Sequence, residues 1–149
     1  MSMPDVSLLR RNRERLEQTV RLVSASVERT ESFDADAEYT PQELEPFDAL
    51  SDRFMRAAES AIRLFRSYER FSQAVPGETF RDTLNTMHKL GIVSNVELWM
   101  DMRDVRNRVV HDYAPQQRER LYRDIRGRFY AELLRVVDRT ARIVGEADE

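Results

Sequence analysis

A stripe of apolar residues at helical spacing between positions 44 and 71 constrains the fold of this chain most strongly. Its members are Leu44, Phe47, Leu50, Phe54, Ala57, Ala61, Phe65, Tyr68 and Phe71. Steps of three and four place these side chains on one face of a helix. Thr40-Pro41-Gln42-Glu43 before the stripe is a capping box with proline at the first helical position, and Pro76-Gly77 after it stops a helix. The pattern predicts one long helix that forms the centre of the core.

Four further helices flank this central one. Apolar periodicity predicts a first helix over about residues 4–30, a short third helix over 79–90 that closes at Gly91, and a fifth over about 116–145. Ser94-Asn95-Val96-Glu97 is a second capping box and opens a fourth helix, which Pro115 ends. Only four glycines interrupt the chain, and strand-like alternation is almost absent. We therefore expect an all-α, antiparallel bundle of four to five helices.

Length and charge limit the remaining possibilities. The 149 residues suit a single domain, 1–149, without disulfides because cysteine is absent. No apolar run approaches the roughly 18 residues of a membrane span, and no signal-peptide core is visible, so we expect a cytoplasmic protein without membrane contact. Residues 28–48 hold eight acids and one arginine, a net charge of −7 within a chain of −3. The stretch 28–40 lacks periodicity and is expected to be an acidic loop, either a solvated insertion or a mimic of nucleic acid.

The candidate chemistry lies in the run Arg106-Asn107-Arg108-Val109-Val110-His111-Asp112-Tyr113 on the predicted fourth helix. The apolar row of this helix is expected to face inward and consists of Trp99, Met102, Val105, Val109 and Val110. Arg106 and Tyr113 lie beside that row, whereas Asn107 and His111 form a second line with Arg103 one turn earlier. Arg106 and His111 diverge by about 140° on an ideal helix. Both can point at one small ligand only if they flank a groove, between bundle helices or at a dimer seam, or if the helix loosens before Pro115.

Two interpretations of this run remain open from the residue types. In the first, His111 is a general acid or base on a phosphodiester, and Arg106 binds the scissile phosphate and stabilises its transition state. Tyr113 and Asn107 then assist, Arg108 adds a further cation, and the 2′-hydroxyl of RNA serves as nucleophile without a metal. In the second, histidine and arginine simply meet the negative end of a helix dipole.

Metal and cofactor sites are not predicted. Asp101, Asp104 and Asp112 do not share one helix face and are expected to form a solvated, salt-bridged surface. His88 is expected to cap the end of the third helix.

The run resembles the Arg-x4-His-x-Tyr motif of the HEPN superfamily, and its HepT-like branch in particular. A glycine turn, Leu90-Gly91-Ile92, and an upstream tryptophan, Trp99, match that branch as well. The resemblance implies a helical homodimer whose two motif helices meet at the two-fold axis, so that Arg106 and His111 of both subunits line one cleft. It also implies a metal-independent RNA-cleaving toxin whose antitoxin is a minimal nucleotidyltransferase, with Tyr113 as the site that this partner adenylylates.

Some relatives with this architecture are instead non-catalytic, substrate-binding partners of nucleotidyltransferases. The two hypotheses differ in their need for a proton-transferring side chain. Replacing His111 with asparagine should abolish a nuclease and preserve a binding subunit. The complete motif favours the nuclease.

Overall fold

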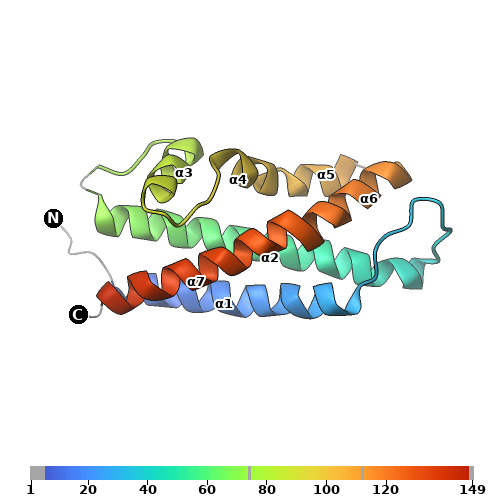
Figure 1. The fold of residues 1–149 in the computed structure, drawn as a ribbon, viewed down its shortest axis with the longest axis horizontal. Helices are drawn as coiled ribbons and strands as arrows, with labels where there is room; N and C mark the ends of the chain where they lie inside the picture. Colours follow the sequence, from blue (N-terminus) through green and yellow to red (C-terminus); the bar gives the residue numbers. More distant parts are fainter. Residues whose placement is uncertain (1–5, 74, 112, 148–149) are drawn as a thin grey trace.

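Two long helices, α1 (Val6–Arg29) and α2 (Pro41–Ser72), form an antiparallel pair along the length of the molecule (Figure 1). The computed structural model describes residues 6–73, 75–111 and 113–147. In α2 the predicted apolar stripe is buried from Phe47 to Phe65 and partly buried at its two ends. The predicted capping box is present, because Glu43 N donates to Thr40 Oγ1 at 3.2 Å and Thr40 N donates to Glu43 Oε1 at 3.0 Å. The central helix expected from the sequence is confirmed.

A third long element crosses this pair and completes the bundle (Figure 1). It comprises α6 (Pro115–Asp124), the π-helical turn η1 (Ile125–Phe129) and α7 (Tyr130–Ala147). The expected fifth helix is therefore correct in extent but is interrupted by a wider turn. Its buried row, Leu121, Ile125, Phe129 and Leu133, advances in three steps of four residues. Such steps drift by about 120° around an ideal α-helix. The π turn absorbs this drift and keeps all four side chains in the core.

A layer of short helices covers the other side of α2. It consists of α3 (Phe80–Lys89), α4 (Val96–Arg103) and α5 (Val105–His111). Gly91 follows α3 with a φ of 78°, the left-handed conformation that glycine adopts freely, as the sequence predicts. The His88 ring does not cap α3 itself, since its Nδ1 lies 3.0 Å from the Val93 carbonyl oxygen beyond the turn. Over the described residues the fold is all-helical, without a strand, and none of the helices is long and apolar enough to cross a membrane.

The loop between α1 and α2 is held in place by aromatic rings. α1 extends to Arg29, so this loop covers residues 30–40 rather than 28–40. Phe33 is buried and stacks on Tyr39 with ring centroids 4.9 Å apart, and its edge meets Phe47 at 5.2 Å. The acidic side chains of the loop are exposed. The loop is thus attached to the end of the bundle while its charges face solvent.

Candidate functional site on α4 and α5

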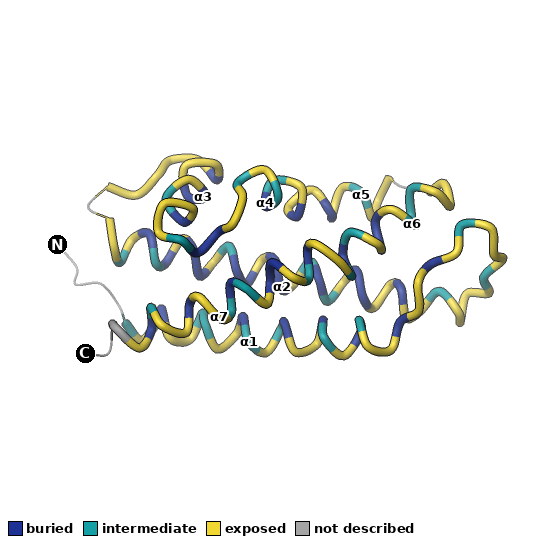
Figure 2. Tube along the Cα trace, in the orientation of Figure 1, coloured by how far each residue is buried: buried dark blue, intermediate teal, exposed yellow. Residues whose placement is uncertain are grey.

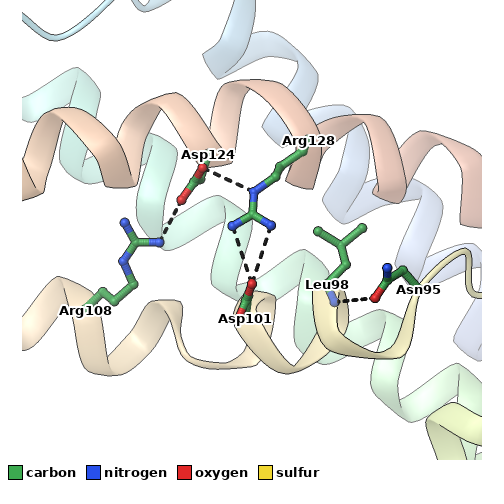
Figure 3. Close-up of polar contacts among 6 residues, drawn as sticks. All are labelled: Asn95, Leu98, Asp101, Arg108, Asp124 and Arg128. Atoms are coloured by element: carbon green, nitrogen blue, oxygen red, sulfur yellow. Dashed lines mark hydrogen bonds and ion pairs between the residues drawn. The ribbon is translucent and has the colours of Figure 1, made fainter.

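A buried glutamate on α7 fixes the start of α4. Glu132 is 3% exposed, and its Oε2 accepts hydrogen bonds from Trp99 Nε1 at 3.0 Å, Ser94 Oγ at 2.6 Å and Ser94 N at 3.2 Å. Trp99 is fully buried and meets the Phe65 ring edge-on at 4.9 Å. The expected capping role of Ser94 is wrong, because Ser94 is engaged by Glu132. Asn95 caps α4 instead, with its Oδ1 accepting from Leu98 N at 3.1 Å (Figure 3).

The expected single helix through the motif is broken at Asp104. Its backbone N–H bonds to the carbonyls of Met100 and Asp101 at 3.2 and 3.1 Å, with φ −73° and ψ −8°, and α5 begins at the next residue. The predicted apolar row is buried across this break but not to its end. Trp99, Met102 and Val105 are buried as predicted, whereas Val109 and Val110 are 37% and 52% exposed. Their predicted inward position is therefore wrong, because the core covers α5 at Val105 and does not extend to the last turn of this helix.

The arginines of the candidate site point to three different elements. Arg103 lies over the Phe80 ring of α3, with its guanidinium carbon 4.5 Å from the ring centroid. Arg106 forms an ion pair with Glu59 of α2, and its side chain is 68% exposed. Arg108 Nη1 donates to Asp124 Oδ2 of α6 at 3.0 Å. The structure therefore does not bring these three cations together within one chain.

Arg108 belongs to a chain of ion pairs that ties α5 to α6 and α4 (Figure 3). Asp124 Oδ1 also accepts from Arg128 Nε at 3.2 Å, and Arg128 Nη1 reaches Asp101 Oδ2 at 3.4 Å. Burial alone would raise the pKa of Asp124, but the hydrogen bonds from Arg108 and Arg128 outweigh it and lower that pKa. The same bond to Asp124 raises the pKa of Arg128. The expected salt-bridged role of Asp101 is confirmed, whereas Asp112 lies outside the described residues.

Asn107, His111 and Tyr113 occupy an open surface. All three are exposed, Tyr113 to 69%, and the outer side of α5 is mostly exposed in Figure 2. Within the part of the chain that the structure describes, the side chains of Asn107 and His111 have no hydrogen-bond partner. Tyr113 N donates to the His111 carbonyl at 3.1 Å, which ends α5 just before Pro115. Arg106 and His111 therefore do not form an enclosed catalytic pair in a single copy of the chain.

A cationic groove of about 410 Å³ lies beside this surface, between α5 and α6. Its lining residues are Arg108, Gln117, Arg120, Arg123 and Asp124. Arg120 and Arg123 are not among the site residues predicted from the sequence, although their spacing of three on a helix after the proline was a usable signal. Arg123 is paired with Glu119 at 2.8 Å and Arg108 with Asp124, so the groove is only partly neutralised. Among the described residues, no three His, Asp or Glu side chains gather in a way that would hold a metal ion.

Comparison of the sequence with known protein families identifies the family to which this helical chain belongs. The profile of the family described as nucleotidyltransferase substrate binding protein like matches residues 7–142. The chain therefore belongs to this family, which is HEPN-like and associated with nucleotidyltransferases. A search of curated proteins gave no match. The expected kinship is thus confirmed at the level of this family, while the HepT-like branch stays a prediction.

Proposed function

We propose that this chain is a non-catalytic partner subunit of a nucleotidyltransferase and helps to hold that enzyme's substrate. The observation that carries the proposal is the divergence of the predicted catalytic pair. Arg106 is held by Glu59 on α2, whereas His111 stands on open surface at the end of α5. General acid or base catalysis requires a positioned side chain, and nothing in the described residues orients the His111 ring. The family match supports the same proposal.

In this function Arg106 is the principal contact to a phosphate of the substrate. The Arg106–Glu59 pair is largely exposed on both sides, so its contribution to stability is small, about 0–1 kcal/mol. A phosphate can therefore replace the Glu59 carboxylate at little cost, and the planar guanidinium suits it well. Asn107, His111 and Tyr113 contribute neighbouring hydrogen-bonding groups, and the groove between α5 and α6 adds Arg120 close by.

The proposed complex includes a homodimer in which the α5 helices of two copies meet. Val109 and Val110 support it, because two neighbouring branched apolar side chains on a short helix are better covered than left in water. Arg106 and His111 from both copies would then line one shared cleft, which a single chain lacks. In the proposed complex, a homodimer of this chain binds the nucleotidyltransferase partner.

The proposal is tested with the chain and the minimal nucleotidyltransferase of the same genome, co-expressed and purified together. Binding of labelled ATP to the complex is measured for wild type, Arg106→Ala and His111→Asn, with Arg139→Ala on α7 as an exposed control. We expect Arg106→Ala to weaken binding about tenfold, as for loss of a charge-assisted hydrogen bond, and His111→Asn and Arg139→Ala to change it less than about threefold. Failure of the two proteins to associate, or equal binding by all variants, would overturn the proposal.

A second candidate function is a metal-independent RNA-cleaving toxin. It is favoured by one observation, that Arg106, His111 and Tyr113 are all accessible to solvent on one short stretch of chain. There the RNA 2′-hydroxyl would attack the adjacent phosphorus, with His111 taking its proton and Arg106 holding the phosphate. The bond from phosphorus to the 5′-oxygen of the next nucleotide would break, leaving a 2′,3′-cyclic phosphate and a 5′-hydroxyl that takes a proton from solvent. A minimal nucleotidyltransferase antitoxin would silence the site at Tyr113, whose phenol oxygen would bond to the α-phosphorus of ATP as pyrophosphate leaves and the phenol proton passes to solvent. The added phosphate would place negative charge where RNA must bind.

A further inference from the structure

A second cationic groove lies between α1 and α2, on elements that carry none of the motif residues. Its volume is about 480 Å³ and it is open to solvent. Its lining consists of Leu8, Asn12 and five arginines, namely Arg11, Arg15, Arg63, Arg66 and Arg70. Asn12 Nδ2 donates to Ser67 Oγ at 3.2 Å, which joins the two helices at this level. We call this feature the arginine groove.

The five guanidinium groups of the arginine groove are not neutralised. No acidic residue lines it, and within the described residues none of its arginine side chains has an ion-pair or hydrogen-bond partner. The nearby acids are engaged elsewhere. Glu17 pairs with Arg13 at 2.5 Å, Glu59 pairs with Arg106, and Glu69 is buried and accepts from Thr83 Oγ1 at 3.1 Å. Glu14, the remaining acid on this part of α1, does not line the groove.

The acids at the other end of the α1–α2 pair, from Glu28 into the connecting loop, are too far away to screen these charges. Arg15 and Glu28 are thirteen residues apart on the same helix, about 20 Å along its axis. The Debye length at 0.15 M salt is only about 8 Å. The α1–α2 pair therefore has a cationic end and an acidic end, although the chain as a whole carries −3. A field of this kind attracts and orients an anion before it binds.

The spacing of the arginines matches an extended anion rather than a single small one. Arg63 and Arg70 are seven residues apart on α2, about 10 Å along the axis, and Arg11 and Arg15 are about 6 Å apart on α1. One row of guanidinium groups on α1 and another on α2 thus line the two sides of the groove. The planar fork of arginine bonds two phosphate oxygens at once. No aromatic ring lines the groove, so bases have no surface on which to stack.

We propose that the arginine groove binds the phosphodiester backbone of a nucleic acid, without sequence preference. This inference does not rest on the proposed function, because the groove and the α5 surface share no residue. Phosphate contacts by arginine position a strand without reading its bases, and each contact adds to the salt dependence of binding. The net negative charge of the chain is no obstacle, since no acid lines the groove, and Glu17, Glu59 and Glu69 near it are engaged by other residues.

The test is binding of a fluorescently labelled 20-nucleotide oligouridine to the full chain, followed by anisotropy between 50 and 300 mM salt. The groove variant is R63Q/R66Q/R70Q. The matched control has the same change in net charge, from −3 to −6, at exposed arginines outside the groove, R21Q/R139Q/R142Q. Because each contact to a single strand contributes about −0.7 to the slope of log K against log salt, three lost contacts should reduce the slope by about 2. The corresponding loss of affinity at 0.1 M salt is about 100-fold.

We expect the control to lose less than about threefold in affinity and to keep its slope. A second groove variant on the other helix, R11Q/R15Q, should reduce the slope by about 1.4, and it keeps the test valid if the first variant unfolds. Equal losses in the groove variants and the control would overturn the proposal, as would unchanged binding by both groove variants. Displacement of the oligonucleotide by polyglutamate at equal charge concentration would also overturn it and would indicate an acidic protein ligand.

Discussion

Glu132 is predicted to be the main polar anchor of the segment that carries the motif, and Glu132→Ala tests this. The substitution leaves Trp99 Nε1 buried without an acceptor, which costs about 1–3 kcal/mol. It also removes one buried methylene with its packing, about 1 kcal/mol. Ser94 is exposed and can turn to water, so its lost bonds add little. The expected loss in free energy of unfolding is about 2–4 kcal/mol.

The assay is thermal unfolding, followed by circular dichroism. For a chain of this size a loss of that magnitude lowers Tm by about 5–15 °C. Glu132→Gln is the matched control, because its amide oxygen can still accept from Trp99 while the negative charge is lost, and it should cost about 1 kcal/mol. A loss below about 0.5 kcal/mol for Glu132→Ala would refute the reasoning, since it would mean that Trp99 does not depend on this acceptor.

Three further predictions concern the surroundings of the motif. Asp124→Asn should lower the free energy of unfolding by about 1 kcal/mol at pH 7. Because the native pKa of Asp124 is lowered, its contribution to stability is present above the unfolded pKa of about 3.9 and is lost as the pH falls through the native pKa. In urea denaturation the variant should therefore be less stable than the wild type at pH 7, and the two should become nearly equal in stability at pH 2. A loss that persists at pH 2 would contradict the ion-pair account. Glu59→Gln should change the free energy of unfolding by less than about 1 kcal/mol. It should also raise the affinity of the complex for ATP up to about fivefold in titration calorimetry, because the Glu59 carboxylate no longer competes with phosphate for Arg106. Weaker binding of ATP would show that Glu59 helps to bind the substrate. Val110→Asp should convert a dimer to a monomer in light scattering, and a chain that is monomeric before the substitution would exclude the shared cleft.

Much of the fold was predictable because it depends on local periodicity. The stripe on α2 and the row from Leu121 to Leu133 determine which helix faces are buried, and the Thr40 box and Gly91 turn set helix ends through contacts a few residues apart. The π turn at Ile125–Phe129 was readable in principle from the three steps of four residues. It was missed because each step alone is compatible with an α-helix.

The break at Asp104 and the cap at Asn95 were not predictable in the same way. Ser94 and Asn95 are both good capping residues, and the choice between them depends on Glu132, which is distant in sequence. The motif identified the residue types of the site, but it could not predict where their side chains point. Arg106 turns to Glu59 on α2 and Arg108 to Asp124 on α6, and both partners come from elements packed against α5 only in the folded chain.

Cleavage of RNA in the absence of metal is the measurement that most directly tests the proposed non-catalytic role. The purified chain is incubated with total tRNA and with single-stranded RNA in excess EDTA, beside Arg106→Ala and His111→Ala. We expect the wild-type chain to leave both substrates as intact as the two variants do. Cleavage by the wild type that both substitutions abolish would contradict the proposal and establish a metal-independent nuclease at Arg106 and His111.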